Sequence, residues 1–230
     1  MSIDSRSEML LGKEELASLK NKTVAVFGLG GVGGTLFEAL VRSGVGHIHI
    51  IDKDVVDESN LNRQILYKRD DIGSKKAGAA FLYAKAIRLD VEVLPECYLI
   101  NKESLAAHDY SSCDILIDCV DDVEAKLALM EYSSATGIPL LLSLGMGNRL
   151  DPSKVYSCRL DKSEGDPLGK KIRGECRKRN IDMKKFTCVL SKEIPLVRGK
   201  KPSSMMMVPS SSGLLLAYLA LSSLLKTKTK

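Results

Sequence analysis

The sequence has few aromatic residues, no paired cysteines and no long hydrophobic run. Phe, Trp and Tyr make up 5% of the 230 residues, so few rings are present on which nucleic-acid bases could stack. Six cysteines form no C-x-x-C pair, which argues against a zinc site built on such pairs and favours free thiols in a reducing compartment. The longest apolar run, residues 213–225, is too short for a bilayer and contains Ser222 and Ser223, so we expect a core helix and no membrane contact.

No hydrophobic targeting segment opens the sequence, because residues 1–8 are mostly polar and charged, and we therefore expect a cytoplasmic protein. The apolar fraction of 44% is ample for the core of a globular domain. The net charge of +5 is mildly basic, which is compatible with a nucleic-acid partner without establishing one.

The stretch TVAVFGLGGVGG, residues 23–34, combines an apolar strand with a glycine-rich turn. Gly28, Gly30 and Gly33 have the G-x-G-x-x-G spacing of a nucleotide-binding loop, with Gly31 inside it. In such loops the first glycine permits a tight turn, the second lets backbone N–H groups approach an anion, and the third lets helix and strand pack closely. The positive end of the following helix then favours a phosphate, whereas the alternative is a tight turn without a ligand.

Strand and helix patterns alternate along residues 1–150, which predicts a parallel, doubly wound sheet. The predicted fold class is α/β: a Rossmann-like, mostly parallel sheet flanked by helices, with a small C-terminal extension. We expect strands at residues 24–27, 48–51, 91–94, 114–118 and 139–143, and helices at residues 8–19, 36–41, 73–89, 102–108 and 123–136. We assign residues 1–150 to a nucleotide-binding core and residues 151–230 to an extension packed on the same domain.

The extension contains a predicted basic helix that begins at Asp166-Pro167, with Asp as the cap and Pro in the first turn. Its cations suit contact with a nucleic-acid backbone, or they form a solvated helix face. We predict nucleic-acid contacts for Lys170, Lys171, Arg173 and Arg177. Around this helix we expect a strand at 154–159, a hairpin made of 187–190 and 194–197, a charged loop at 198–202 and an apolar helix at 211–225.

Polar residues follow the predicted strands, at the sheet edge where doubly wound folds bind ligands. Asp52 ends the second strand about 20 residues past the glycine loop, where it holds ribose hydroxyls or caps its own loop. Asp121 follows the fourth strand and either binds Mg²⁺ at the phosphates or caps the next helix, a role that Asp122 serves equally well. Asp118 belongs to the strand and is expected to be structural. A second glycine loop, residues 145–148, joins this edge after the fifth strand.

A dense polar cluster, Asn60, Asn62, Arg63 and Gln64, lies in the loop after the second strand. The planar guanidinium of Arg63 is suited to phosphate oxygens. Lys76, at the start of the next helix, can add a second positive charge there. The alternative for each cation is a solvated surface position.

Two cations, a carboxylate and a phosphate loop suit nucleotidyl transfer better than hydride transfer. Adenylation needs neutralisation of charge on the α-phosphate while pyrophosphate leaves. An NAD dehydrogenase is an alternative, but it needs a proton-transfer group near the nicotinamide. None of the three histidines, His47, His49 and His108, is well placed for that role.

Five motifs occur in order: GLGGVGG at 28–34, D-x-D at 52–54, N-x-N-R-Q at 60–64, K-A at 76–77 and D-C-V-D at 118–121. Together they resemble the ThiF/MoeB/ubiquitin-activating superfamily of ATP-dependent adenylating enzymes over residues 8–150. Within it, SLGMGNRLDP at 143–152, DPLGKKIR at 166–173 and CVLS at 188–191 are most similar to the tRNA threonylcarbamoyladenosine dehydratase branch. Gly34, where serine is usual, and a short segment between 178 and 202 depart from that pattern.

The resemblance implies ATP and Mg²⁺ as cofactors, and it assigns roles to individual residues. The counterpart of Asp52 binds ribose, and that of Asp121 binds Mg²⁺. The counterparts of Asn60, Arg63 and Lys76 hold phosphates. The candidate catalytic residues are therefore Arg63, Lys76 and Asp121. The same nucleotide site includes Gly28, Gly30, Gly31, Gly33, Asp54, Asn62 and Gln64. A monovalent cation, K⁺ or Na⁺, is also implied, and the sequence does not identify its ligands.

The implied reaction is the ATP-dependent cyclisation of threonylcarbamoyladenosine in tRNA through an acyl-adenylate, with release of AMP and pyrophosphate. The resemblance also implies a homodimer, in which Arg6 reaches the partner's site, and a sulfur-relay protein as a further partner. Cys188 matches a family cysteine, and either a structural or a functional role is open to it. Two alternatives stay open: adenylation of the C-terminus of a ubiquitin-like or sulfur-carrier protein, and a non-catalytic subunit of an activating heterodimer.

Overall fold

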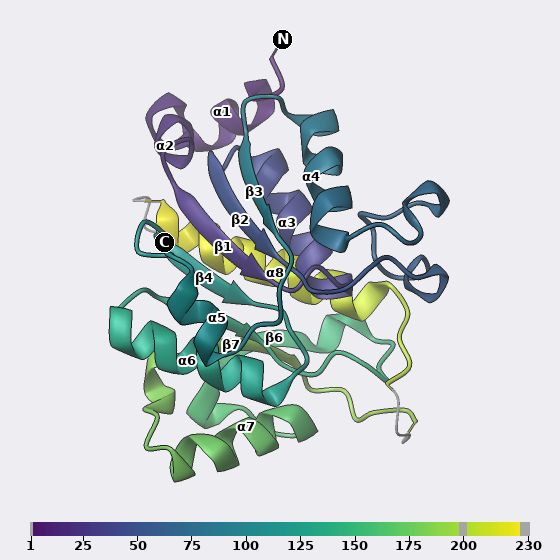
Figure 1. The fold of residues 1–230 in the computed structure, drawn as a ribbon, viewed down its shortest axis with the longest axis vertical. Coiled ribbons are helices and arrows are strands. Elements are labelled where there is room, and N and C mark those ends of the chain that lie inside the picture. Colours follow the sequence, from purple (N-terminus) through teal and green to yellow (C-terminus); the bar gives the residue numbers. More distant parts are fainter. Residues whose placement is uncertain (1, 198–201, 226–230) are drawn as a thin grey trace.

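Seven strands and eight α-helices make up the part of the chain that the computed structural model describes, residues 2–197 and 202–225 (Figure 1). The strands are β1 (Thr23–Phe27), β2 (His47–Ile51), β3 (Glu92–Glu96), β4 (Ile115–Asp118), β5 (Leu140–Ser143), β6 (Val155–Arg159) and β7 (Thr187–Ser191). The helices are α1 (Ser5–Leu11), α2 (Lys13–Leu19), α3 (Gly31–Ser43), α4 (Lys76–Ile87), α5 (Lys102–Ala107), α6 (Val123–Thr136), α7 (Pro167–Lys178) and α8 (Met207–Leu224).

The strands form one sheet in the order β3-β2-β1-β4-β5-β7-β6, and only the β6–β7 pair is antiparallel. The predicted α/β, Rossmann-like fold class is therefore confirmed. The chain moves outward from β1 in one direction to β3 and in the other direction from β4. The loops after β1 and β4 consequently diverge, which opens a crevice at the carboxyl ends of the strands.

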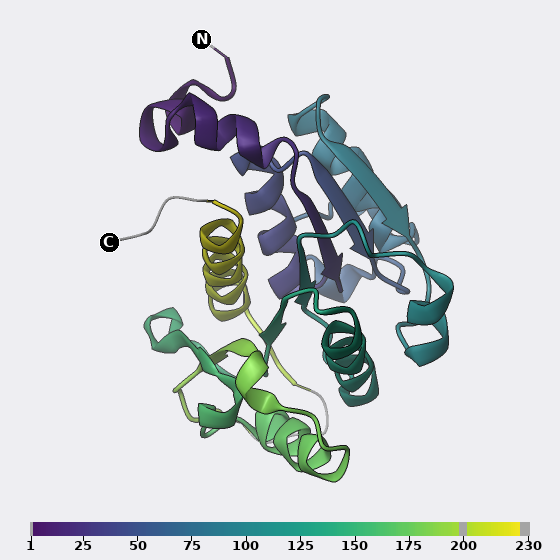
Figure 2. The ribbon, with the colours of Figure 1, turned by 90° about the vertical axis from the view of Figure 1, so that its left-hand side faces the viewer.

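Helices cover both faces of this sheet (Figure 2). Val24 and Val26 of β1 face the core beneath α3, α4 and α8, whereas Ala25 and Phe27 face the core beneath α5 and α6. Because both faces of the central strands are buried, β1 is apolar from Val24 to Phe27, as is typical of parallel strands.

Helix α8 crosses one face of the sheet and packs against α3. The fit is close at Gly213, where a Cβ atom would lie 2.5 Å from the Val32 carbonyl oxygen. The predicted core helix is thus confirmed, but it begins at Met207 and has 18 residues. Among the described residues it is the one helix whose length and composition alone would allow it to cross a membrane, because it extends beyond the apolar run at 213–225; a buried core helix meets the same criteria. Its residues Val208, Leu216 and Ala220 are buried against the rest of the protein.

The structure differs from the predicted secondary structure at the N-terminus and in the extension. The predicted N-terminal helix is divided at Gly12, whose φ of +84° ends α1 and starts α2. The predicted hairpin is wrong, because β7 pairs with β6 and residues 194–197 form no strand. Residues 198–201 of the predicted charged loop lie outside the described residues. Strands β6 and β7 of the extension complete the sheet of the core, while the boundary at residue 150 stays a prediction.

Candidate active site

The first glycine loop connects β1 to α3 and depends on close backbone contacts. Gly28 has a φ of +92°, and a Cβ atom there would lie 3.0 Å from the Cys119 carbonyl group. A Cβ atom on Gly33 would lie 1.8 Å from the Gly28 carbonyl oxygen, so only glycine lets α3 pack on the turn. No side chain caps the N-terminus of α3, which leaves its first N–H groups available to an anion.

Asp52 joins this loop to the end of β2. Its Oδ2 atom accepts a hydrogen bond from the Leu29 N–H at 2.7 Å, and its Oδ1 atom accepts one from the Asp54 N–H at 2.8 Å. Burial raises the pKa of Asp52, and the nearby positive charge of Lys76 opposes that shift. Asp52 therefore does cap its own loop, and the remaining lone pairs of its oxygens stay available for ribose hydroxyls.

Two cations lie beyond Asp52. The buried Lys76 begins α4, and its Nζ atom is 3.1 Å from Asp54 Oδ2. The Arg63 side chain is half-buried, and its Nη1 atom donates to the Ser59 carbonyl oxygen at 2.8 Å. Since a backbone carbonyl does not neutralise a guanidinium, Arg63 keeps its charge available for an anion.

The amide side chains of the same loop have different surroundings. Asn60 is buried and accepts a hydrogen bond from the Asp57 N–H, closing a short capping box. The buried Oε1 atom of Gln64 has no hydrogen-bond partner among the described residues, so it can accept a bond from a ligand. Asn62 instead donates to the Ser204 carbonyl oxygen at 2.9 Å and ties the loop to the segment before α8.

Three carboxylates lie at the end of β4 and in the loop after it, and their surroundings differ. Asp118 is fully buried and accepts a hydrogen bond from Lys126 Nζ at 2.9 Å, which confirms its predicted structural role. Asp122 caps α6 by accepting from the Ala125 N–H at 2.9 Å. Asp121 is exposed, and in the described part of the chain its carboxylate has no hydrogen-bonding partner. It is the carboxylate of this loop that is free to bind a ligand.

A second glycine loop follows β5 and is held by a buried arginine that sequence reasoning missed. Arg149 Nη2 lies 3.0 Å from Asp166 Oδ2, and both side chains are almost fully buried. The same guanidinium donates to the carbonyl oxygens of Gly145 at 2.6 Å and Glu193 at 3.1 Å. Asp166 also caps α7, as predicted, by accepting from the Gly169 N–H at 2.7 Å.

Asn148 connects this loop to two later segments of the chain, at Leu196 and Ser203. It adopts a φ of +63°, its N–H donates to the Ser203 carbonyl oxygen at 2.6 Å, and its carbonyl oxygen accepts from the Leu196 N–H at 2.7 Å. Its side-chain oxygen accepts from the Ser203 N–H at 2.7 Å. The segments on both sides of residues 198–201 are therefore anchored to the second glycine loop.

All of these elements surround one cavity of about 690 Å³. Most of the predicted nucleotide-site residues line it. They are Gly28, Gly30, Gly31, Asp52, Asp54, Asn60, Arg63, Gln64, Lys76 and Asp121. Gly33 and Asn62 do not line it: Gly33 packs α3 on the turn, and Asn62 holds the C-terminal segment. The opposite wall is formed by residues 143–149 and by Asp166, Pro167 and Leu168 at the start of α7.

The cysteines near this cavity are suited to packing. Cys188 is buried in β7, and its Sγ atom lies 3.9 Å from Cys158 Sγ on the paired strand. Burial raises the pKa of Cys188 and of Cys119, so both groups are neutral thiols at neutral pH. Since the thiolate is the nucleophilic form, this environment favours the structural role for Cys188.

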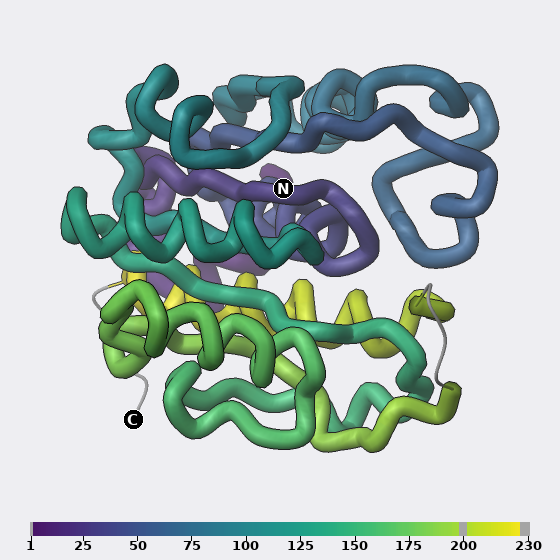
Figure 3. Tube along the Cα trace, turned by 60° about the horizontal axis from the view of Figure 1, so that its bottom comes forward, coloured from purple at the N-terminus to yellow at the C-terminus, as the bar shows by residue number. Residues whose placement is uncertain are grey.

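The predicted nucleic-acid residues lie on α7, which packs on the outer side of α6 (Figure 3). Lys170, Lys171 and Arg177 are exposed and form no ion pair with any described residue. Arg173 is half-buried and donates to the Ser163 hydroxyl, so it is engaged within the protein. Sequence reasoning missed three more exposed lysines, Lys162, Lys184 and Lys185, because they lie in separate short turns beside α7.

The chain belongs to the ThiF family, whose model matches residues 5–212. It is 35% identical to the tRNA threonylcarbamoyladenosine dehydratase of Bacillus subtilis, over 96% of this chain and 94% of that protein. The structures of the Escherichia coli tRNA N6-threonylcarbamoyladenosine dehydratase TcdA in complex with AMP and with ATP cover 95% of this chain and 92% of TcdA. Their TM-scores are 0.89 and 0.87, at 28% and 29% identity. The resemblance inferred from the motifs is confirmed.

Proposed function

We propose that this protein is an ATP-dependent tRNA threonylcarbamoyladenosine dehydratase. One observation carries the proposal: a single cavity brings together an uncapped helix N-terminus, two cations and a free carboxylate, in a chain that is similar to such dehydratases along nearly its whole length. This set of groups is suited to adenylation, in which charge on the α-phosphate must be neutralised while pyrophosphate leaves.

Each group has a distinct task in the proposed reaction. The N–H groups at the start of α3 and the side chains of Arg63 and Lys76 bind the phosphates, and Asp52 holds the ribose. A carboxylate oxygen of the threonyl group attacks the α-phosphorus of ATP, and the bond to pyrophosphate breaks. The carbamoyl group then attacks the activated carbonyl carbon and expels AMP. Because the ring closes within one molecule, no protein nucleophile is required, in agreement with the neutral thiols near the site.

The donor set fits Mg²⁺, the cofactor that we propose beside ATP. Mg²⁺ is commonly held by one or two carboxylates together with substrate phosphates, and Asp121 supplies a free carboxylate in the phosphate cavity. The described residues contain no cluster of three or more His, Cys, Asp or Glu side chains that could hold a metal without a substrate. When bound, Mg²⁺ would neutralise charge on the phosphates. The monovalent cation, K⁺ or Na⁺, stays a prediction without assigned ligands.

We propose that the tRNA backbone contacts the basic surface around α7. The start of α7 lines the cavity at Pro167 and Leu168, so a backbone bound along this helix approaches the adenylation site. Residues 151–197 carry twelve Lys and Arg against seven Asp and Glu, which gives this part of the chain an excess of positive charge. Lys170, Lys171 and Arg177 are the exposed cations of α7 that are best suited to phosphate contact.

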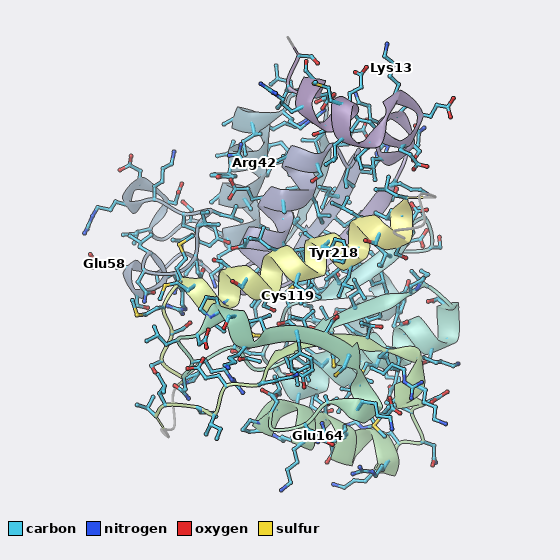
Figure 4. The ribbon with its side chains drawn as sticks, turned by 180° about the vertical axis from the view of Figure 1, so that it is seen from behind. Lys13, Arg42, Glu58, Cys119, Glu164 and Tyr218 are labelled. Atoms are coloured by element: carbon cyan, nitrogen blue, oxygen red, sulfur yellow. The ribbon has the colours of Figure 1, made fainter. Side chains whose placement is uncertain are left out.

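We also propose a homodimer. Apolar side chains are exposed on α1 at Met9 and Leu10, which are 79% and 83% exposed, and on α8 at Leu214 and Tyr218. Figure 4 shows α8, with Tyr218, lying across the rear surface of the protein. Burial of these side chains in a subunit contact would remove them from water and stabilise a dimer. The crossing of Arg6 into the partner's site, a sulfur-relay partner and a cytoplasmic location stay predictions that accompany this proposal.

The proposed function is tested by incubating the protein with ATP, Mg²⁺ and tRNA. We expect AMP and pyrophosphate to form when the tRNA carries threonylcarbamoyladenosine, together with a tRNA nucleoside that has lost one water. AMP formation of equal rate with tRNA that lacks the modification would contradict the proposal. A parallel reaction with a Gly-Gly-ended carrier protein tests the alternative adenylyltransferase, which predicts carrier-dependent exchange between ATP and pyrophosphate.

A further inference from the structure

The segment before α8, residues 202–206, connects two walls of the cavity, and we call it the strap. Two of its residues, Pro202 and Ser204, line the cavity. At one end the strap contacts the second glycine loop, and at the other end it contacts Asn62 in the loop after β2. Most of its side chains are exposed, so the strap is held mainly by hydrogen bonds rather than by burial.

Asn148 holds the first end of the strap through three hydrogen bonds to Ser203. The Asn148 N–H donates to the Ser203 carbonyl oxygen at 2.6 Å. The Asn148 side-chain oxygen accepts from the Ser203 N–H at 2.7 Å and from the Ser203 hydroxyl group at 2.9 Å. Gly147 leaves room for the strap here, because a Cβ atom on Gly147 would lie 2.7 Å from Pro202 Cβ. The second glycine loop therefore fixes the position of Ser203.

The side chain of Asn62 lies between the other end of the strap and Arg63. Its Nδ2 atom donates to the Ser204 carbonyl oxygen at 2.9 Å, and its Oδ1 atom accepts from Arg63 Nη1 at 2.9 Å. A carbonyl oxygen only accepts and a guanidinium only donates, so these two partners fix the orientation of the amide group. The Arg63 guanidinium is thus connected to the strap through a single side chain.

These contacts determine which part of the Arg63 guanidinium stays free. Both N–H groups of Nη1 are used, because this atom also donates to the Ser59 carbonyl oxygen at 2.8 Å. The Nε and Nη2 atoms have no hydrogen-bond partner among the residues that the structure describes, so three N–H groups of Arg63 stay available. Two of them form the planar fork that suits two oxygens of one phosphate.

Arg63 lies beside the start of α3. A Cβ atom on Gly31, the first residue of this helix, would lie 3.2 Å from the Arg63 carbonyl oxygen and 3.6 Å from Arg63 Cγ. The N-terminus of α3 has no side-chain cap, and both Gly31 and Arg63 line the cavity. The first turn of the helix and the Arg63 guanidinium are therefore neighbouring groups that both favour an anion.

We propose that Asn62 and Asn148 are positioning residues, which together hold the Arg63 guanidinium ready for the phosphates of ATP; the proposal rests on the ATP site proposed above. Asn62 does not line the cavity, and the side-chain oxygen of Asn148 is used by Ser203, so both act through Arg63. An arginine that is held in its bound orientation loses less side-chain freedom when the ligand binds. The second glycine loop thus contributes to phosphate binding at the first.

A double-mutant cycle with Arg63, measured by calorimetric titration with ATP and Mg²⁺, tests this proposal. Asn62→Ala should weaken ATP binding about threefold to tenfold, the range that one hydrogen bond provides. Asn148→Gly, which keeps the positive φ accessible and removes the acceptor for Ser203, should have an effect of the same size. Arg63→Ala should weaken binding about tenfold to hundredfold. In the Arg63→Ala protein neither asparagine change should weaken binding further, whereas separate structural effects would multiply.

Asn180→Gly is the matched control. Among the described residues, Asn180 is the other non-glycine residue with a positive φ, which is +55°, and it does not line the cavity. Its replacement should leave ATP binding unchanged. Thermal unfolding of each variant establishes that it is folded, and Ser203→Ala, which removes one of the bonds to Asn148, replaces Asn148→Gly if the latter is not.

The outcomes separate the two proposals. The positioning role is wrong, and the ATP site stands, if the asparagine changes leave ATP binding unaltered, if they weaken it by the same factor with and without Arg63, or if Asn180→Gly matches Asn148→Gly. Effects that disappear in the Arg63→Ala protein support the positioning role. If the same protein forms no AMP with the modified tRNA, the proposed function is wrong while the positioning role stands. A protein that binds no ATP overturns both.

Discussion

The two glycine loops border the same cavity but are held in opposite ways. The first, residues 28–33, is held by backbone contacts: Gly28 and Gly33 admit atoms that any side chain would displace. The second, residues 145–148, is held by charge, because the guanidinium of Arg149, the next residue, binds Asp166 and the Gly145 carbonyl oxygen. Beside the first loop the N-terminus of α3 has no side-chain cap and stays available to a ligand, whereas the second loop uses its polar groups within the protein.

This difference indicates where the chemistry occurs. A free helix N-terminus, the Arg63 guanidinium and the Asp121 carboxylate surround the first loop, so a phosphate group meets unsatisfied charges there. At the second loop Arg149 and Asp166 already bond to each other and to the backbone, so a ligand there contacts a wall of the cavity with few free polar groups. We therefore propose that adenylation takes place at the first loop and that the second loop shapes the wall that the acceptor contacts.

The largest expected effect comes from breaking the network of the second loop. Arg149→Met leaves the buried Asp166 without its charged partner, and we expect a loss of about 3–5 kcal/mol in the free energy of unfolding. Urea denaturation measures this loss. The double variant Arg149→Met/Asp166→Leu removes both charges and should recover much of the stability. If Arg149→Met alone were as stable as the unmodified protein, the second loop would not depend on this pair.

The next effect tests the free carboxylate at the first loop. Asp121→Ala removes the group proposed to hold Mg²⁺, and we expect AMP formation to slow about 10²–10³-fold while the protein stays folded. Its neighbour provides the matched control. Asp122 also lines the cavity, but its carboxylate is engaged in capping α6, so Asp122→Ala should cost about 1 kcal/mol of stability and leave the rate within a small factor. Equal rate losses in the two variants would contradict the assignment.

The two loops also differ in how well the sequence predicts them. The first loop could be predicted because its glycines form a local motif whose spacing reflects backbone geometry, and because Asp52 and Arg63 follow it in motifs of their own. Arg149 and Asp166 are 17 positions apart and belong to different elements, so only the fold brings them together. The charge pair of the second loop consequently left no local signal.

The hairpin was predicted wrongly because strand pairing, like the Arg149–Asp166 pair, depends on contacts between distant parts of the chain. Residues 187–190 and 194–197 have the local pattern of a hairpin, but β7 finds its partner in β6, about 30 residues earlier, and β5 on its other side. The sequence could predict that a strand is present, because apolar β-branched residues show it. It could not predict the partner, because pairing is decided by the whole sheet.

A smaller effect tests the close packing of the first loop. Gly33→Ala places a Cβ atom against the Gly28 carbonyl oxygen, and we expect a loss of about 1–3 kcal/mol in stability. Gly174→Ala in α7, where a Cβ atom meets nothing within 4 Å, should instead stabilise the protein by about 0.5–1 kcal/mol. Equal unfolding midpoints for the two variants would show that the first loop tolerates a side chain.

The smallest effect concerns the basic surface beside the second loop. The double variant Lys170→Ala/Lys171→Ala should weaken tRNA binding severalfold and reduce its salt dependence, by a slope of about 0.9 for each phosphate that the protein no longer neutralises. AMP formation at saturating tRNA should not change. Lys178→Ala is the matched control, since Lys178 already pairs with Glu175 at 2.7 Å. A full effect in the control and none in the double variant would place the tRNA elsewhere.

The central claim is that the first glycine loop supports transfer of AMP to a carboxylate of the tRNA substrate. Its most direct test uses tRNA whose threonyl carboxylate is labelled with heavy oxygen, followed by mass analysis of the AMP released. We predict that each AMP carries one heavy oxygen from the substrate, because the acyl-adenylate breaks between the carbonyl carbon and that oxygen. Unlabelled AMP, with the heavy oxygen in inorganic phosphate or retained in the nucleoside, would contradict the account.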